Sequence, residues 1–147
     1  MIRIFSKGCE YALRVLTKPE LSEDTGRFSI KKICKKIKIP ESYTRKIFQA
    51  LVRKGILTAA QGPGGGYCLK KSPGEISVLS VIEAVDGRNA LQNCVMGFKE
   101  CSNRKPCAVH PLWGPVRAQI ASELEIVTLE HLRNHLKKNP TKKERPR

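Results

Sequence analysis

Apolar side chains recur at helical spacing in two adjacent segments near the start of the chain. Within residues 30–37 they fall at i, i+3, i+4 and i+7, while lysines occupy the opposite face. Ser29 is suited to cap this helix, and Pro40 ends it because the residue before a proline is biased away from helix. The spacing resumes within residues 41–54. Two short helices joined by a tight turn predict a helix-turn-helix.

A glycine-rich turn follows the second helix. Residues 56–60 and 67–70 have the composition of short strands, and they flank Gly-Pro-Gly-Gly-Gly at residues 62–66. Glycine tolerates positive φ and lets the backbone approach another surface closely. The pattern therefore predicts a β-hairpin that forms the wing of a winged helix-turn-helix.

Two more helices complete the expected head. Residues 6–16 form a first helix that braces the helix-turn-helix, and the polar residues 18–27 form a loop. Ser77 caps a fourth helix, and Gly87 ends it.

The C-terminal third predicts a long helix that pairs with another copy of itself. Residues 112–127 carry one apolar stripe with few charges, and Thr128 is suited to cap a short last helix over residues 129–136. A two-fold homodimer would match two half-sites on duplex DNA. The stripe consists of Leu112, Val116, Ile120, Leu124 and Val127.

These elements predict a mainly α fold with a small β-hairpin wing, in which a winged helix-turn-helix head carries a long dimerisation helix. From Arg133 onward, seven basic residues stand against one acid, which is typical of disorder. We expect a head at residues 1–87, a cysteine-rich loop at 88–111, dimerisation and terminal helices at 112–136, and a basic disordered tail at 137–147.

Charge points to nucleic acid as the partner. The chain of 147 residues has a net charge of +15. Between Arg27 and Lys54, ten Lys and Arg residues face the single acid Glu41, a local net charge of +9. Such density suits a phosphate backbone, whereas lysines on one helix alone would equally suit a solvated face.

The same chain is poorly suited to a membrane. No stretch approaches the roughly 18 apolar residues of a membrane-spanning helix. Residues 1–16 are charged where a signal peptide needs an apolar core. We therefore expect a cytoplasmic protein with duplex DNA as its partner.

The expected DNA contacts lie on the second helix, the wing and the lysine-rich helix. The second helix presents its start to the major groove, the wing approaches the backbone, and lysines contact phosphates. The candidate residues are Ser42, Tyr43, Thr44, Arg45, Lys46, Gln61, Gly64, Gly65, Tyr67, Lys31 and Lys35.

Three cysteines and a histidine lie within a polar stretch after the head. Cys94, Cys101, Cys107 and His110 have the spacing C-x6-C-x5-C-x2-H, and thiolate and imidazole are ligands of zinc and of iron–sulphur clusters. The spacing is too long for one helix face, so a metal would have to gather them. The alternative is three unrelated thiols in an ordinary loop. Disulfide bonds are not expected, because cysteines of cytoplasmic proteins are rarely disulfide-bonded. Cys34 and Cys68 are expected to be packing residues.

Nothing in the sequence points to an enzyme. The wing glycines are not followed by the Lys-Ser/Thr of a phosphate-binding loop, and the three histidines lack an evident nucleophile partner.

Several motifs together resemble the Rrf2 family of winged-helix regulators over residues 1–136. The resemblance implies a homodimeric transcription factor whose three cysteines hold an iron–sulphur cluster. Between the two common types we favour the two-iron (2Fe-2S) over the four-iron (4Fe-4S) cluster. The matching motifs are residues 6–14, 39–43, 62–67, 75–77 and 111–113 together with the cysteine loop.

The resemblance leaves two candidates for the fourth ligand. His110 matches the position used in the IscR branch of the family, and Glu10 matches an acidic position used across the dimer in the NsrR branch. We favour His110 because it lies close to Cys107 in sequence. The wing has Gln61 where the family often has arginine, the residue suited to a narrow minor groove. Arg45 and Lys46 replace an acid and an amide of the IscR branch, so the recognition helix departs from that branch at both positions.

The sequence thus predicts a DNA-binding transcriptional regulator, a repressor, whose operator binding is controlled by an iron–sulphur cluster that senses redox state, nitric oxide or iron. Two alternatives keep the DNA-binding dimer. In one the three cysteines and the histidine hold a structural zinc ion, and in the other the thiols sense oxidants without metal.

Overall fold

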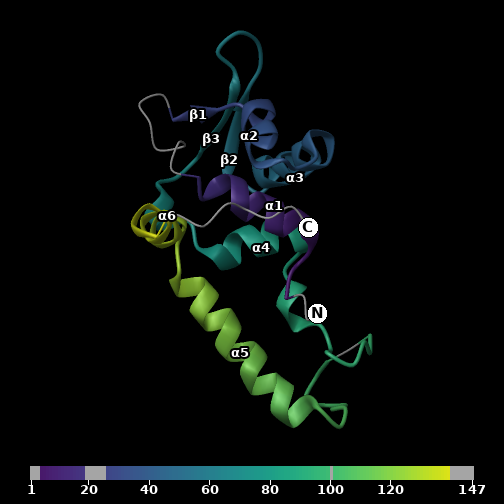
Figure 1. Cartoon of the computed structure of the whole chain (residues 1–147). Helices are drawn as coiled ribbons and strands as arrows, with labels where there is room; N and C mark the ends of the chain where they lie inside the picture. The colour runs from purple at the N-terminus through teal and green to yellow at the C-terminus, as the bar shows by residue number, and fades with distance from the viewer. Residues whose placement is uncertain (1–3, 19–25, 100, 140–147) are drawn as a thin grey trace.

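The computed structural model describes residues 4–18, 26–99 and 101–139. Figure 1 shows a head built from helices and a small sheet, a long helix that projects from it, and a last helix that returns to the head. In chain order the elements are α1 (Lys7–Leu16), β1 (Arg27–Phe28), α2 (Ile30–Ile37), α3 (Glu41–Arg53), β2 (Leu57–Ala60), β3 (Gly66–Leu69), α4 (Val78–Asp86), α5 (His110–Ile126) and α6 (Leu129–Lys138). Short 3-10 turns η2 (Pro73–Glu75) and η3 (Ala90–Gln92) flank α4. The predicted mainly α, winged architecture is confirmed.

Side-chain caps begin four of the helices. Ser6, Ser29, Ser77 and Thr128 each accept a hydrogen bond from the backbone N–H three residues later. Each cap satisfies a donor that the first helical turn leaves unpaired. Lys38 ends α2 with φ of 54°, so the chain turns sharply before α3. The predicted helix-turn-helix is therefore present.

The structure adds a strand, β1, whose first residue, Arg27, the sequence analysis assigned to a loop. β1 pairs antiparallel with β3, with Phe28 opposite Tyr67, and the sheet order is β1-β3-β2. The Phe28 ring packs 5.9 Å from Phe48 and 6.2 Å from Tyr67, between ring centroids. A two-residue strand has no periodicity to detect, and the burial of one phenylalanine holds it in place. Residues 19–25 of the expected loop lie outside the described residues.

The apolar stripe of α5 divides into two parts. Leu124 and Val127 pack against the buried Val78 and Ile82 of the head. At the other end of the helix, Leu112 is 75 % exposed and Val116 is 48 % exposed. Within the stripe, the residues at the start of α5 therefore remain open to a partner. Ile126, at the other end of the helix, is also 67 % exposed but is not part of the stripe. The helix itself begins at His110, two residues earlier than predicted.

Backbone hydrogen bonds tie the junction of α5 and α6 to the head. The Val78 N–H donates to the Val127 carbonyl at 2.8 Å, and the Leu129 N–H donates to the Ile76 carbonyl at 2.9 Å. Arg133 is buried, and its Nε donates to the Leu16 carbonyl at 3.0 Å, at the end of α1. Burial lowers the pKa of this guanidinium. The base of α5 is thus fixed to the head.

Helix α6 continues to Lys138, so the first two residues assigned to the tail are helical, and residues 140–147 lie outside the described residues. None of the helices in the described ranges is long and apolar enough to cross a bilayer.

Candidate functional site

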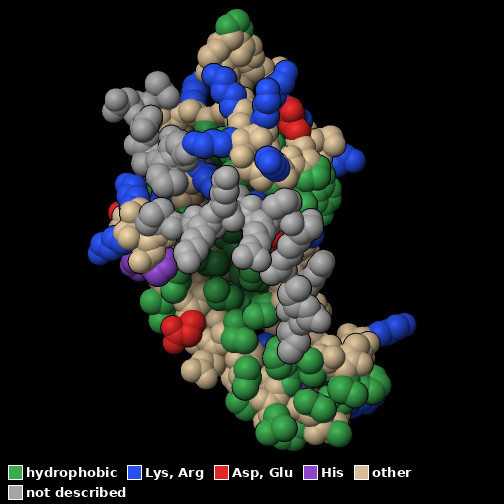
Figure 2. Space-filling view, viewed as in Figure 1, with side chains coloured by type: hydrophobic (Ala, Val, Ile, Leu, Met, Phe, Trp, Pro, Cys, Tyr) green, Lys and Arg blue, Asp and Glu red, His purple; other side chains and the backbone are tan. Residues whose placement is uncertain are grey.

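Most of the residues predicted to contact DNA share one exposed face of the head. Ser42, Tyr43, Arg45 and Lys46 are exposed on the first turns of α3, and Lys31 and Lys35 are exposed on α2. Figure 2 shows Lys and Arg side chains gathered over the part of the head where Figure 1 places α2, α3 and the sheet.

Thr44 differs from the prediction. It is fully buried, and its hydroxyl donates to the Pro40 carbonyl at 2.7 Å. The side chain satisfies a backbone acceptor at the start of α3 and does not belong to the exposed face, so it is corrected to a structural residue. Its neighbour Arg45 pairs with Glu41 at 2.5 Å on the exposed surface. Exposed pairs at this spacing contribute only about 0.3–0.5 kcal/mol, so Arg45 can exchange Glu41 for another partner.

A groove separates the helix-turn-helix from the wing. Its volume is about 750 Å³, and basic side chains of Lys31, Arg45 and Arg53 lie on its helical side. The wing contributes Gln61, Gly65 and Tyr67 among other residues. The groove therefore combines positive charge with close backbone approach, as a phosphate backbone requires.

Two wing positions require glycine. A Cβ at Gly65 would stand 2.4 Å from the Ala60 carbonyl oxygen, and one at Gly66 would stand 2.5 Å from the Phe28 carbonyl oxygen. Gly66 also has φ of 139°, a conformation that other residues rarely adopt. The sequence analysis read these glycines as surface-approach residues; the structure shows that they also allow the hairpin and β1 to pack together.

Arg27 is a basic wing residue to which the sequence analysis gave no individual role. Its Nη1 lies 3.4 Å from the Gly64 carbonyl oxygen, at the tip of the wing. The guanidinium therefore stands at the end of the wing although Gln61 replaces the arginine common in the family. Arg27 reaches this position because β1 pairs with β3, and no pattern in the sequence predicts that pairing.

Helix α1 supports the exposed start of α3. A Cβ at Gly8 would stand 2.7 Å from Ile47 Cδ1 and 3.1 Å from Tyr43 Oη. The Tyr11 and Tyr43 rings meet edge to face with centroids 6.0 Å apart. Tyr43 therefore packs against α1 on one side and remains 43 % exposed on the other.

The four predicted metal ligands come together as two pairs. Cys94 Sγ lies 3.9 Å from Cys107 Sγ, and Cys101 Sγ lies 3.2 Å from His110 Nδ1. The other ring nitrogen of His110, Nε2, lies 2.8 Å from Asn103 Oδ1. Across the described ranges, no three Cys, His, Asp or Glu side chains are gathered tightly enough to hold a metal ion as they stand.

The donor set nevertheless fits a metal or cluster. Two thiolates on one tetrahedral ion with bonds of about 2.3 Å are roughly 3.8 Å apart, close to the separation of the Cys94 and Cys107 sulphurs. Loss of hydration raises the pKa of the Cys94 thiol, but hydrogen bonds from the Phe98 and Met96 backbone and from the thiols of Cys107 and Cys101 together lower it below its ordinary value. A lowered pKa favours the thiolate, which is the ligand form.

Two cysteines outside this loop, Cys9 and Cys34, have the opposite environment. Burial, helped by the nearby Asp86, raises the pKa of the Cys9 thiol to about 12. Burial also raises the pKa of the Cys34 thiol. Cys68 is half-buried in β3, where its sulphur lies 2.8 Å from Thr58 Oγ1. Cys9 and Cys34 are protonated packing residues, as expected from their positions on apolar helix faces.

Glu10, the alternative fourth ligand, is engaged elsewhere within the chain. Lys7 Nζ lies 2.9 Å from both of its carboxylate oxygens. Of the two candidates for the fourth ligand, His110 is the one whose side chain contacts a cysteine of the loop in the described part of the chain.

Helix α5 holds the cysteine loop along one face. His110 contacts Cys101, Trp113 Nε1 donates to the Asn93 carbonyl at 3.1 Å, and Arg117 Nη1 donates to the Gln92 carbonyl at 2.8 Å. The sequence analysis missed the last two contacts because each ends on a backbone oxygen.

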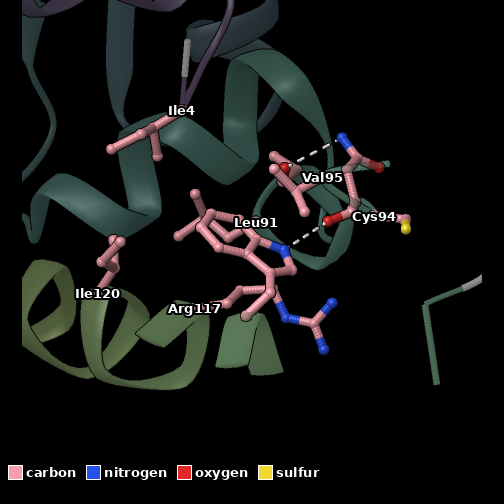
Figure 3. Close-up of a pocket in the computed structure, with 9 residues that line it drawn as sticks. Ile4, Leu91, Cys94, Val95, Arg117 and Ile120 are labelled. Atoms are coloured by element: carbon pink, nitrogen blue, oxygen red, sulfur yellow. Dashed lines mark hydrogen bonds between the residues drawn. The ribbon is translucent and has the colours of Figure 1, made fainter. Parts of the chain in front are cut away.

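A pocket of about 270 Å³ lies beside these contacts. Figure 3 shows Ile4, Leu91 and Ile120 around it, with the Cys94 sulphur on the far side from Ile4 and Ile120. Cys94 is one of the residues that line the pocket, and its sulphur lies 3.9 Å from the Cys107 sulphur.

Comparison with known proteins extends over nearly the whole chain. The model of the Rrf2 family, described as iron-dependent transcriptional regulators, matches residues 5–135. The HTH-type transcriptional regulator IscR of Klebsiella pneumoniae is 33 % identical over 134 residues, which cover 91 % of this chain and 81 % of the relative. The IscR of Pectobacterium carotovorum is 34 % identical over 134 residues, 91 % of this chain and 80 % of the relative.

Solved structures share the fold. CymR (YrzC), the global cysteine regulator of B. subtilis, superposes with a TM-score of 0.75 at 23 % identity and covers 92 % of this chain and 98 % of its own. T. potens IscR superposes with a TM-score of 0.66 at 18 % identity, over 97 % of this chain and 91 % of its own. The relatives are transcriptional regulators, which confirms that the chain is not an enzyme. The chain belongs to the Rrf2 family of iron-dependent, winged-helix transcriptional regulators that bind DNA.

Proposed function

We propose that this chain is a cytoplasmic, homodimeric repressor whose operator binding is controlled by an iron–sulphur cluster of the 2Fe-2S type. Cys94, Cys101, Cys107 and His110 would hold the cluster. The observation that carries the proposal is the convergence of these four residues as two close pairs at the start of α5. When bound, the cluster would supply iron that reacts with oxidants or nitric oxide and is lost when iron is scarce.

On the DNA side, the exposed start of α3 enters the major groove. Tyr43, Arg45 and Lys46 read base edges or phosphates there, together with Ser42. Lys31 and Lys35 of α2 contact phosphates, and the wing residues Gln61, Gly64, Gly65 and Tyr67 follow the backbone. The groove between wing and helices, with its basic side chains, supports this assignment.

A second copy covers the start of α5. Leu112 and Val116 are exposed, and Figure 2 shows hydrophobic side chains gathered at the end of the molecule away from the basic face. Ile120 lines the neighbouring pocket, while Leu124 and Val127 connect the helix to the head. The dimer therefore forms mainly through Leu112, Val116 and Ile120.

Side-chain contacts connect the cysteine loop to α5, the proposed dimerisation helix. His110, Trp113 and Arg117 bind the cysteine loop to α5, and the other end of α5 is bonded to the head. In a dimer, α5 sets the separation of two recognition helices, which must match half-sites about 34 Å apart. Losing the loop's hold on α5 would alter that separation, and allosteric couplings of about 1–3 kcal/mol are usual.

Protein purified without oxygen provides the test. We expect visible absorption of an iron–sulphur cluster, with iron and sulphide in equal amounts, and operator affinity that changes about tenfold when the cluster is removed. One zinc ion for each chain without sulphide would support the structural zinc alternative instead. Equal operator affinity of the holo and apo forms would refute cluster control.

The separation of Cys94 and Cys107 favours a metal-free thiol sensor as a second candidate. Their sulphurs are 3.9 Å apart, close enough to approach disulfide distance with a small movement. The Cys94 thiolate would attack a hydroperoxide oxygen and release water or an alcohol. Cys107 would then displace water from the sulfenic acid, so two thiols lose two electrons to the hydroperoxide. The solved structure of the oxidized form of Staphylococcus aureus CymR has a related fold, with a TM-score of 0.69 and 24 % identity.

Mass spectrometry separates the two candidates. A thiol sensor loses two hydrogens in a Cys94–Cys107 peptide pair when the metal-free protein meets hydrogen peroxide, and its operator affinity changes with that disulfide. Unchanged operator affinity after complete disulfide formation would exclude thiol sensing.

A further inference from the structure

Asn103 brackets the imidazole of His110 from the side opposite Cys101. Cys101 Sγ lies 3.2 Å from His110 Nδ1, and Asn103 Oδ1 lies 2.8 Å from His110 Nε2. Both residues come from one short stretch, which the antiparallel bridge between Ser102 and Lys105 folds into a turn. The ring is therefore held at both nitrogens by residues only two positions apart.

The contact with Asn103 determines which nitrogen carries the proton. An amide oxygen only accepts hydrogen bonds, and a neutral imidazole has one N–H and one lone pair. A 2.8 Å contact between Nε2 and Oδ1 therefore places the proton on Nε2. The lone pair of Nδ1 then faces the Cys101 sulphur.

The surroundings of the ring limit other orientations. His110 is 93 % buried, being 7 % exposed, and begins α5. A Cβ at Gly114, one turn further along the helix, would stand 3.4 Å from Nε2, an ordinary van der Waals distance. The ring therefore lies close against this turn of α5.

We propose that Asn103 is a positioning residue that fixes His110 as the Nε2–H tautomer, so that Nδ1 is the atom offered to the metal. The inference rests on the proposed function for the metal, but the tautomer itself is a property of the metal-free chain. Ligating histidines commonly donate their other N–H to an oxygen acceptor, and losing that partner weakens metal affinity about 10- to 100-fold.

The first measurement uses the reduced, metal-free, full-length protein. Long-range proton–nitrogen correlation spectra of ¹⁵N-histidine protein should show His110 protonated at Nε2. Asn103→Ala should give a mixture of tautomers, and Asn103→Asp, which keeps the acceptor oxygen, should restore the Nε2–H form. Asn89→Ala, on the exposed turn after α4, is the matched control and should behave as the wild type. A proton on Nδ1 in the wild type, or an unchanged tautomer in Asn103→Ala, would overturn the assignment.

The second measurement uses Co²⁺ alone as the metal probe. The absorption of a thiolate-bound Co²⁺ ion should show affinity about 10- to 100-fold weaker for Asn103→Ala than for the wild type, with Asn103→Asp close to the wild type. His110→Gln should weaken binding at least as much. If Asn103→Ala bound Co²⁺ as tightly as the wild type, the positioning role would be refuted. If the wild type bound neither Co²⁺ nor a cluster, the proposed metal function would fail while the tautomer result still stood.

Discussion

Ser6 and Asp86 join the first turn of α1 to the last turn of α4. The Ser6 backbone N–H donates to Asp86 Oδ2 at 2.7 Å, and the Ser6 hydroxyl donates to Oδ1. The same hydroxyl oxygen accepts from the Cys9 N–H and so caps α1. Because the cysteine loop follows α4 and α1 supports α3, this contact lies between the two functional regions.

Asp86→Ala should destabilise the head by about 1–2 kcal/mol, since two hydrogen bonds to a charged group are lost on a partly exposed surface. Glu83→Ala is the control because it removes a carboxylate from the same end of α4. Removing either acid relieves an unfavourable interaction with the helix dipole, so only the difference between the variants measures the contact. Urea unfolding provides that difference, and equal midpoints would show that the Ser6 contact contributes nothing.

The wing glycines give a graded prediction. Gly66→Ala should lower stability by about 1–3 kcal/mol and weaken DNA binding, because the new Cβ would meet the Phe28 carbonyl in a strained backbone. Gly64→Ala has positive φ but nothing within 4 Å of its Cβ, so it should cost only about 1 kcal/mol. Thermal unfolding and DNA titration would measure both. A Gly64 variant as damaged as the Gly66 variant would contradict the packing of the wing on β1.

Local signals in the sequence were enough to predict most of the head. The hydroxyl caps, Pro40 and the glycine run each impose structure through their own backbone chemistry, so Ser29 and Ser77 cap helices where expected. β1 could not be predicted in this way. Its two residues are held by Phe48 and Tyr67, which are distant in sequence, and no local pattern encodes such a contact.

The sequence analysis predicted which residues could bind a metal, but not which other side chains contact the cysteine loop. Cysteine and histidine spacing identified the candidate ligands, whereas Asn103, Trp113 and Arg117 act through contacts that depend on how the loop folds. Thr44 is a case in which the sequence analysis predicted a DNA contact that the structure does not support. Its place between Tyr43 and Arg45 suggested exposure, yet helical geometry turns it inward.

Val116→Asp should break the proposed dimer without unfolding the head. Val116 is 48 % exposed in one chain, so aspartate is tolerated there until a second copy buries it unpaired. The free energy of dimerisation should become less favourable by about 3–5 kcal/mol. Ala118→Asp, exposed on the opposite side of α5, is the control and should remain dimeric. Light scattering at micromolar concentration decides, and a wild type that is already monomeric would refute the dimer.

Lys35 and Arg45 should affect DNA binding in different ways. Lys35 is exposed on α2 and proposed to contact phosphate, so Lys35→Ala should weaken binding to operator and unrelated DNA alike. It should also reduce the log–log salt slope by about 0.9, the value for one phosphate contact. Arg45 lies on α3 with Glu41 as its exposed partner, and Arg45→Ala should instead change the preference among sequences.

Lys99→Ala tests whether these effects are local. Lys99 is an exposed lysine of the cysteine loop, so its loss lowers net charge by the same amount as the loss of Lys35. If the basic face of the head carries the interaction, Lys99→Ala leaves the salt slope nearly unchanged, because charges beyond the Debye length of about 10 Å at 0.1 M salt are screened. An equal reduction for Lys99 and Lys35 would mean that total charge, rather than the face formed by α2, α3 and the wing, attracts DNA.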